Sequence, residues 1–505
     1  MSARPDSYRS LLIADGIRAS SLRTPNKVAL SLGERALAYR DLVERIDRVS
    51  NVGLSGLGLE PGDRVALMAP NCLEFIEIVA GLSSVGIAPA MINPRLTAPE
   101  LAYIVNDSGA RVLFVHETLE ELARSVELNT VERIVVIGGN YDDLLAKASP
   151  VAPSVSVDEW QPFCVSYTSG TTGNPKGALL SHRSRSLTFF GMAVEYGCYS
   201  PEDRAIAIAP LYHGGGFAFA MAPIFFGGTC AIVPRFDPEE VLALIAAERS
   251  TNTFMVPTHF NALFALGEPT LGNADVSSLR TVISNAAPLP QATKGAIVEW
   301  LGEGILHETY GSTEGSIVTN LRPPDQLRKE QCVGQPFPCT EVRLLDADGT
   351  EVPAGEVGEL YSRSPYLFNG YWGLPDATAE AFKDGWLSVG DLARKDDEGH
   401  IYIVDRKKDM IISGGVNVYP REVEEVLHEH PAVAEAAVVG VQDDYWGEAV
   451  KAIVAVREGH EATETGVIDF CAESLAGFKL PKSVEFVEAL PRNAAGKVLR
   501  RELRT

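Results

Sequence analysis

The segment from Tyr167 to Gly177 brings together the residue types that bind phosphate. It reads Tyr-Thr-Ser-Gly-Thr-Thr-Gly-Asn-Pro-Lys-Gly, so glycines, hydroxyl side chains and Lys176 share eleven positions. Glycines let backbone N–H groups approach phosphate oxygens, hydroxyls donate further hydrogen bonds, and lysine adds positive charge. A flexible surface loop is the alternative, but such a loop has no need of this mixture. The segment therefore predicts a phosphate-binding loop.

Several common catalytic signatures are absent from the sequence. The loop is not G-x-x-x-x-G-K-[ST], and no G-x-G-x-x-G, G-x-S-x-G or H-E-x-x-H occurs. These absences count against an ordinary P-loop ATPase, a dinucleotide-dependent dehydrogenase, a serine hydrolase and a zinc protease.

Four further segments follow the loop along the chain. They are Tyr310-Gly-Ser-Thr-Glu-Gly315, Trp386-Leu-Ser-Val-Gly-Asp391, Asp405-Arg-Lys-Lys-Asp409 with Gly414-Gly415, and Pro491-Arg-Asn-Ala-Ala-Gly-Lys497. Together with the loop they resemble, in family order, the motifs of the adenylate-forming superfamily. That superfamily includes acyl-CoA synthetases, peptide-synthetase adenylation domains and firefly luciferase. The five segments span essentially the whole chain, so chance is a poor explanation for the set.

The resemblance implies how ATP would be bound. Tyr310 would stack on adenine, while Asp391 and Arg406 would bind the ribose hydroxyls. Glu314 would hold Mg²⁺ against the phosphates, with Thr313 beside the α-phosphate; outside this motif, Glu314 would be an ordinary surface carboxylate. The other residues expected to contact ATP or AMP are Thr168, Ser169, Gly170, Thr171, Thr172, Gly173, Lys176, Gly311 and Lys497.

The reaction implied by the resemblance has two halves. A substrate carboxylate attacks the α-phosphorus of ATP and pyrophosphate leaves, while Lys497 and Thr172 stabilise the developing charge. A small C-terminal domain then rotates about Lys408, and a thiol, that of coenzyme A, takes the acyl group. Gly414 and Gly415 would line the pantetheine tunnel, where absent side chains permit close approach. Without the motif that precedes it, Lys497 would be interpreted as a solvated residue near the C-terminus.

The acyl pocket is expected around His213, Phe217, Asn285 and Ala286. His213 resembles the aromatic gate residue near the acyl carboxylate, and we group it with the catalytic residues; a lone histidine is otherwise a hydrogen-bonded core residue. Asn285 stands where relatives commonly carry glycine. Asparagine tolerates positive φ, but its amide would narrow the pocket or offer a hydrogen bond. Val389 also departs from the family pattern, which has threonine there.

The charges near this pocket predict the class of acid. No Asp lies between Tyr212 and Phe217 to hold an α-ammonium group, and no Lys or Arg occurs in 212–217 or 284–290 to meet a second carboxylate. A fatty or aromatic monocarboxylic acid is therefore favoured over an amino acid.

The leading hypothesis is a stand-alone acid:CoA ligase that releases AMP and pyrophosphate. The alternative is a stand-alone ligase that loads an acyl or aryl acid onto a carrier protein, and a luciferase-like oxygenase is more remote. A regulator that had lost catalysis would be expected to lack Lys497 or Glu314, and both are present.

Composition sets limits on partners and surroundings. The chain has 505 residues and a formal charge of -23, which opposes non-specific binding to nucleic acid or anionic membranes. Its seven dispersed cysteines favour reduced, buried structural thiols. No signal peptide or transmembrane segment is evident, so we expect a cytoplasmic enzyme whose partners are the acid, ATP and coenzyme A. A homodimer is left open.

The elements expected to position these residues alternate between strand and helix. Strands are predicted near 65–68, 111–115, 133–137 and 253–256, with helices at 73–85 and after the capping residue Asp237. Turn signals between 341 and 405 favour antiparallel strands. Beyond them, helices at 420–429 and 463–475 alternate with strands at 433–441, 449–456 and 484–487.

These patterns predict an α/β protein with two domains and a hinge. The large N-terminal domain, residues 1–405, would comprise layered α/β subdomains and a β-rich subdomain. Residues 406–408 would form the hinge, and residues 409–505 a small mobile α+β domain that carries Lys497.

Overall fold

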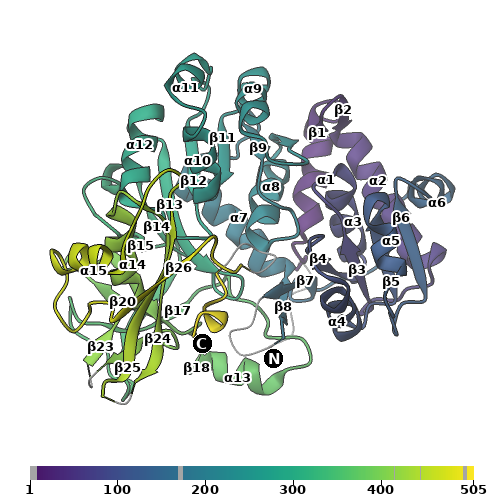
Figure 1. Cartoon of the computed structure of the whole chain (residues 1–505). Helices are drawn as coiled ribbons and strands as arrows, with labels where there is room; N and C mark the ends of the chain where they lie inside the picture. Colours follow the sequence, from purple (N-terminus) through teal and green to yellow (C-terminus); the bar gives the residue numbers. More distant parts are fainter. Residues whose placement is uncertain (1–7, 169–173, 414–415, 444, 493–497, 505) are drawn as a thin grey trace. The chain divides into compact units, whose positions relative to one another are not determined.

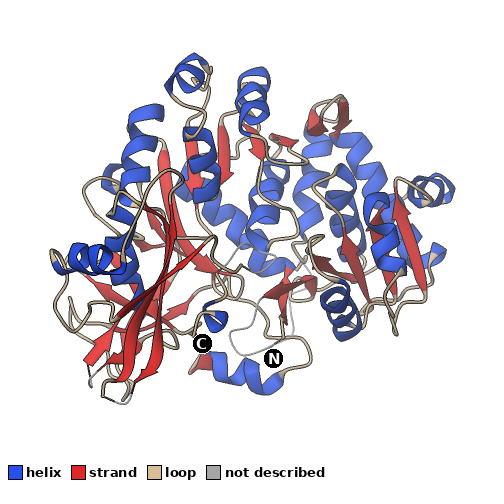
Figure 2. Ribbon diagram, viewed as in Figure 1, coloured by secondary structure: helices blue, strands red, loops and turns tan. Residues whose placement is uncertain are grey.

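The chain forms two compact units, each built of sheets and helices (Figures 1 and 2). The computed structural model describes residues 8–168, 174–413, 416–443, 445–492 and 498–504. Unit 1 comprises Met1–Glu341 and Ser362–Leu387, and unit 2 comprises Val342–Tyr361 and Ser388–Thr505. The predicted hinge, residues 406–408, lies within unit 2, and its role as a hinge remains a prediction.

The smaller sheet of unit 1 ends in the strand pair that flanks the predicted phosphate loop. Its strands are β6 (Arg133–Ile137), β5 (Val112–His116), β3 (Arg64–Met68), β4 (Ala88–Ile92), β7 (Pro162–Thr168) and β8 (Lys176–Ser181), in spatial order. All neighbours are parallel except β7 and β8. Parallel strands are normally covered on both faces, and the apolar run of β3 is accordingly buried from Val65 to Met68.

The larger sheet of unit 1 carries the second predicted motif on its antiparallel side. Its strands are β15 (Gln335–Pro336), β14 (Ser316–Leu321), β13 (Leu306–Ser312), β12 (Thr281–Ser284), β11 (Asn252–Met255), β9 (Arg204–Ala207), β10 (Thr229–Ile232), β1 (Val28–Leu32) and β2 (Arg35–Ala38), in spatial order. The strands from β13 to β1 are parallel to their neighbours. The outer pairs β13–β14, β14–β15 and β1–β2 are antiparallel.

Helices cover the sheets of unit 1, and two of them are buried on nearly every side. These are α3 (Leu73–Ser83) and α8 (Gly214–Phe226), whose apolar residues join the main core. The other helices are α1 (Ile13–Arg23), α2 (Tyr39–Asn51), α4 (Ala98–Ser108), α5 (Glu120–Arg124), α6 (Tyr141–Lys147), α7 (His182–Tyr196), α9 (Pro238–Glu248), α10 (Pro257–Phe264), α11 (Glu268–Asn273), α12 (Gln291–Leu301) and α13 (Pro375–Ala381). None of the helices in the described ranges combines the length and the apolar character that a membrane span requires.

Unit 2 contains a β-rich part followed by an α+β part. The first part includes β16 (Glu341–Leu345), β17 (Gly358–Arg363), β20 (Asp391–Lys395) and β21 (Ile401–Arg406). Two short strands between β17 and β20 in the sequence, β18 (Phe382–Lys383) and β19 (Trp386–Leu387), belong to unit 1 instead. The second part contains β22 (Ile411–Ser413), β23 (Val416–Val418), α14 (Pro420–Glu429), β24 (Val433–Asp443), β25 (Gly447–Val456), α15 (Glu464–Ala472) and β26 (Ser483–Val487). The long antiparallel pair β24–β25 carries its core.

The α/β class predicted from the sequence is confirmed, and most predicted elements lie where expected. Asp237 caps α9 by accepting hydrogen bonds from the backbone N–H groups of Glu239 and Glu240 at 3.1 Å. One prediction about cysteine is wrong. Cys339 is exposed, because it lies in the loop between β15 and β16, whereas the other six are buried.

Candidate active site

The predicted phosphate loop joins β7 to β8, and its two ends are held face to face. Thr168 and Lys176 are paired residues of these antiparallel strands. The hydroxyl of Thr168 lies 3.5 Å from the carbonyl oxygen of Lys176. The predicted ligands Ser169, Gly170, Thr171, Thr172 and Gly173 lie outside the described residues. The ends of the loop are therefore fixed by the sheet.

Glu314, the predicted metal ligand, is buried beside the end of this loop. Glu314 as a whole is only 8% exposed. Oε1 accepts a hydrogen bond from the hydroxyl of Tyr371 at 2.9 Å and lies 3.4 Å from the hydroxyl of Thr168. The carboxylate is therefore oriented by two neutral donors that come from distant parts of the chain.

Tyr371 was missed by the sequence analysis, and backbone pairing explains its position. The segment around it runs along β8: the N–H of Leu179 donates to the carbonyl of Gly370 at 2.9 Å, and the N–H of Trp372 donates to that of Gly177 at 2.7 Å. Lys176 Nζ lies 5.2 Å from the centre of the Tyr371 ring. Burial and the nearby Glu314 carboxylate raise the pKa of Tyr371, so its hydroxyl stays a donor. No local signal in the sequence pairs Tyr371 with Glu314.

The hairpin of β13 and β14 presents the Tyr-Gly-Ser-Thr-Glu-Gly motif. Tyr310 and Gly311 are in β13, and Thr313 and Glu314 are in the turn before β14. Gly311 is required here, because a Cβ at this position would lie 1.9 Å from the carbonyl oxygen of Ser316. Tyr310 and Thr313 are half-buried. The hairpin thus gathers three predicted nucleotide ligands around Glu314.

The predicted gate residue His213 immediately precedes the buried helix α8, and its side chain makes no capping hydrogen bond to the helix. The Asn71 amide holds the segment before it: its Oδ1 accepts from the N–H of Leu211 at 2.8 Å, and its Nδ2 donates to the carbonyl of Ala209 at 3.2 Å. The His213 ring packs 4.5 Å from that of Tyr212. Asn71 therefore fixes the backbone before His213, and, like Tyr371, it lies outside every predicted motif.

The other predicted acyl-pocket residues sit at two different places in unit 1. Phe217 is buried in α8 and stacks on Phe163 of β7, with ring centroids 5.7 Å apart. Asn285 follows β12, and its Nδ2 donates to Thr309 Oγ1 at 2.7 Å. The positive φ in this segment belongs to Ala286, at 77°, and not to Asn285. Asn285 Oδ1 accepts from the N–H of Ala286, so the asparagine amide supports this strained neighbour.

Asp391 and Arg406, the predicted ribose ligands, meet in unit 2. They are paired residues of β20 and β21, and Arg406 Nε lies 3.0 Å from Asp391 Oδ1. Asp391 is buried. Lys408 follows in an exposed turn, where its carbonyl oxygen lies 3.4 Å from Arg504 Nη2. Two predicted ribose ligands are therefore brought together.

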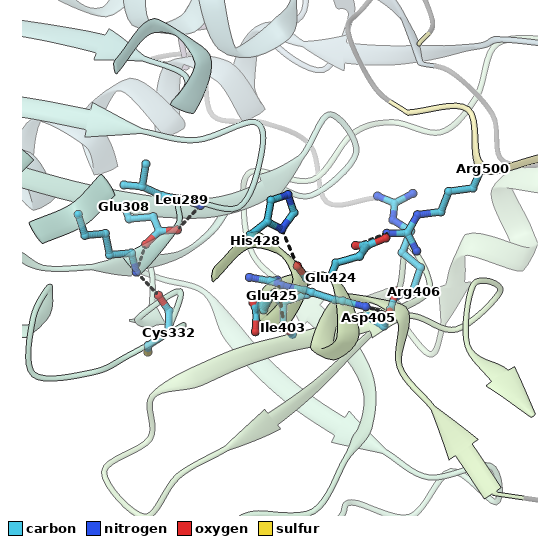
Figure 3. Close-up of polar contacts among 12 residues, drawn as sticks. Leu289, Glu308, Cys332, Ile403, Asp405, Arg406, Glu424, Glu425, His428 and Arg500 are labelled. Carbon is cyan, nitrogen blue, oxygen red and sulfur yellow. Dashed lines mark hydrogen bonds and ion pairs between the residues drawn. The ribbon is translucent and has the colours of Figure 1, made fainter. Parts of the chain in front are cut away.

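The chain on either side of the predicted lysine motif is anchored within unit 2. Arg492 and Val498 form a β-bridge, and the N–H of Leu499 donates to the carbonyl of Pro491 at 2.8 Å. Arg500 makes two 2.7 Å hydrogen bonds to the carboxylate of Glu424 (Figure 3). Lys497 itself lies outside the described residues, as do Gly414 and Gly415.

Comparisons with known proteins agree with this arrangement. A family model of the AMP-binding enzyme matches residues 17–372, and one of the AMP-binding enzyme C-terminal domain matches residues 422–497. The chain therefore belongs to the family of AMP-binding, adenylate-forming enzymes.

Individual relatives cover nearly the whole chain. The chain is 38% identical to a feruloyl-CoA synthase from Amycolatopsis sp, over 95% of this chain and 96% of the relative. It is 35% identical to the fatty acid–[acyl-carrier-protein] ligase ScoC from Streptomyces coeruleorubidus, over 95% and 93%. The crystal structure of ATP-bound MatB from Rhodopseudomonas palustris shares 32% identity, with a TM-score of 0.90 and coverage of 98% of both chains. The predicted family and enzyme class, an AMP-forming acid–thiol ligase of the acyl-CoA synthetase type, are confirmed.

Proposed function

We propose that this enzyme converts ATP and a fatty or aromatic carboxylic acid to an acyl-adenylate, and then transfers the acyl group to coenzyme A. The observation that carries the proposal is the buried carboxylate of Glu314, which Tyr371 and Thr168 hold beside the end of the phosphate loop. A loop that binds anions next to a fixed carboxylate suits a metal–nucleotide substrate. The names of the relatives support a carboxylic acid and a thiol acceptor.

Adenylation needs binding and charge stabilisation rather than a protein nucleophile. The acid carboxylate attacks the α-phosphorus in line with the departing pyrophosphate. Lys176, Thr172 and Lys497 would donate to phosphate oxygens whose charge grows in the transition state. His213, at the start of α8, would orient the attacking carboxylate. Tyr310 would hold adenine, with Thr313 near the α-phosphate.

Mg²⁺ fits the donor set around Glu314. Among the described residues no group of three or more His, Cys, Asp or Glu side chains is arranged so that it could hold a metal ion, so the protein would supply few metal ligands. Mg²⁺ commonly uses one or two carboxylates together with phosphate oxygens and water. Glu314 would be that carboxylate, and the ion would neutralise phosphate charge.

Thioester formation would require the predicted C-terminal domain, residues 409–505, to present a second face. We infer that residues 406–408 serve as the hinge between functional domains 1–405 and 409–505, with Lys408 as the pivot. Lys497 would leave the site after adenylation, and Gly414 and Gly415 would let pantetheine approach. A carrier-protein thiol is the second candidate acceptor, favoured by the similarity to ScoC.

Release of AMP tests the function. The purified enzyme is incubated with ATP, Mg²⁺ and a panel of short, medium, long-chain and aromatic acids, with and without coenzyme A. AMP formation that requires both an acid and coenzyme A is the expected result. Acid-dependent pyrophosphate release without a thioester would favour a carrier protein, and no acid-dependent reaction would contradict the proposal.

The role of Lys497 is tested by separating the half-reactions. Lys497→Ala is expected to abolish adenylation while leaving thioester formation from a supplied acyl-adenylate largely intact. Equal loss of both reactions in a folded variant would contradict the assignment.

We further propose that the enzyme acts in the cytoplasm and as a homodimer. Fractionation of cells and light scattering of the purified protein test these two points, and a monomer at micromolar concentration would contradict the second.

A further inference from the structure

Arg185 is a buried cation that has no acidic partner in the described part of unit 1. It lies in α7 and is only 4% exposed. Its Nη1 donates to the hydroxyl of Ser316 at 3.2 Å, while Nε has no hydrogen-bond partner among the described residues. Burial lowers the pKa of the guanidinium, which is the direction expected for a charge removed from water without compensation.

Within the described ranges, the groups that interact with Arg185 are neutral. Ser316 Oγ lies 3.1 Å from the hydroxyl of Thr188, one turn along α7. The titratable group that acts on Arg185 is the buried thiol of Cys164 on β7, and burial raises the pKa of this thiol, which keeps it uncharged. A buried cation is costly unless an anion or several acceptors complete its shell. Among the described residues the site therefore offers a buried guanidinium and lacks an anionic acceptor.

This site lies on a helix that packs against the helix carrying part of the predicted acyl pocket. The backbone of Ser316 packs so closely against Gly311 that no Cβ could fit there. On the other side, α7 packs against α8, the helix that carries Phe217 of the predicted pocket. Arg185 thus contacts the β13–β14 hairpin, which carries the predicted nucleotide ligands, and belongs to a helix that packs against α8 of the predicted acyl pocket.

We propose that Arg185, with Ser316, recognises an oxygen acceptor at the tail end of the acid, most favourably a second carboxylate. A guanidinium suits this role, because its planar array of N–H donors matches the two oxygens of a carboxylate. The inference rests on the proposed acid-activating function and refines its substrate class. The expectation of a purely apolar tail considered only residues 212–217 and 284–290, and Arg185 lies outside both ranges.

Matched acids and matched variants test the inference. The acids are a straight-chain monocarboxylic acid and the α,ω-dicarboxylic acid of equal length, and cinnamic acid with and without a para-hydroxyl or para-carboxyl group. These arms distinguish a second carboxylate from a phenolic oxygen. The variants are Arg185→Met, which keeps side-chain length without charge, and the control Arg183→Met, which removes a half-exposed arginine of α7 that pairs with Glu159 at 2.8 Å.

The wild-type enzyme and Arg183→Met should prefer a tail-oxygen acid over its apolar counterpart by about 30-fold or more in kcat/KM, as expected for a buried charge interaction. Arg185→Met should lose that preference and keep its rate with apolar acids. Equal rates for both acids in the wild-type enzyme, or an equal loss with every acid in Arg185→Met, would overturn the inference.

Calorimetric binding of each acid in the presence of AMP separates this inference from the proposed function. Binding of tail-oxygen acids that depends on Arg185, without AMP formation from ATP, would support the site and contradict the function. AMP formation with no dependence of binding on Arg185 would support the function and overturn the site.

Discussion

Two buried cations of unit 1 have opposite surroundings. Lys294 in α12 is 1% exposed, and its Nζ lies 2.5 Å from Oε2 of Glu308, which is itself 5% exposed. The carbonyl oxygen of Cys332 lies 3.3 Å from the same Nζ. Arg185 is buried almost as deeply, yet within the described residues its hydrogen bond goes to a neutral hydroxyl.

The difference separates a structural charge from a charge that is available to a ligand. Lys294 and Glu308 compensate each other, so neither needs a further partner. Arg185 carries a desolvation cost that the described protein does not offset. Functional sites often retain such locally unfavourable groups, because the ligand completes them. The comparison therefore predicts that mutation changes the folding free energy in opposite directions at the Lys294–Glu308 pair and at Arg185.

The largest effect is expected when the compensated pair is broken. Glu308→Gln keeps the shape but removes the charge, which leaves Lys294 buried without an anion. The variant should lose about 3–5 kcal/mol of folding free energy. Urea unfolding followed by tryptophan fluorescence measures this loss.

A double variant supplies the control for the broken pair. Lys294→Met combined with Glu308→Leu removes both charges, and it should recover most of the stability lost in Glu308→Gln. A double variant as unstable as the single one would mean that shape, rather than charge compensation, holds this region.

A smaller effect on folding stability is expected from His182. Its two ring nitrogens can make their hydrogen bonds only when the ring is neutral. Its Nδ1 accepts from the N–H of Ile13 at 3.2 Å, and Nε2 lies 3.1 Å from the carbonyl oxygen of Ser83. Burial lowers the pKa of His182 from 6.5 to about 4. Below pH 6.5 the unfolded chain therefore binds the proton more readily than the folded one. Stability should fall as the pH drops from 6.5 to 4, by about 3 kcal/mol in total.

Comparison with His182→Gln isolates this contribution. His307 also has its pKa lowered to about 4 by burial, so the variant keeps part of the pH dependence. The stability difference between the two proteins should be largest at pH 7 and shrink toward pH 4. Parallel stability curves over that range would show that His182 does not titrate in this way.

The elements of the fold were more predictable than the surroundings of these groups. Asp237 and Pro238 marked the start of α9, and the strand near 65–68 was found from its apolar run, because both signals are local. The Thr168–Lys176 and Tyr310–Glu314 motifs were also found locally. The partners of those motifs were not, because Tyr371 reaches Glu314 through pairing with β8, and Arg185 reaches Ser316 through packing of α7 against β14. Such contacts depend on the tertiary structure.

Tyr371 provides an intermediate case, because its neutral hydroxyl donates to the charged carboxylate of Glu314. Tyr371→Phe removes the hydroxyl that donates to Glu314 Oε1. A hydrogen bond to a charged group contributes about 1.5 kcal/mol, so the rate of adenylation at limiting Mg²⁺ should fall about tenfold. The concentration of Mg²⁺ needed for half-maximal rate should rise, because Glu314 loses its orientation.

Tyr141→Phe is the matched control for Tyr371→Phe. The hydroxyl of Tyr141 donates to Glu77 Oε1 at 2.6 Å, and Arg45 compensates that carboxylate. The control should lower stability and leave the Mg²⁺ dependence unchanged. The same change in Mg²⁺ dependence in both variants would contradict a positioning role for Tyr371.

The smallest effect, and the one of opposite sign, is expected at Arg185. Arg185→Met replaces an uncompensated buried charge by an apolar side chain of similar length, at the cost of one hydrogen bond to Ser316. The folding free energy should rise by about 0.5–1 kcal/mol, measured by the same urea unfolding. A gain in stability joined to a loss of discrimination between acids is the signature of a ligand-binding charge. A loss of about 3 kcal/mol of folding free energy in Arg185→Met would be comparable to that in Glu308→Gln. It would show that Arg185 has a structural role like that of Lys294, because removal of a purely structural cation destabilises the protein.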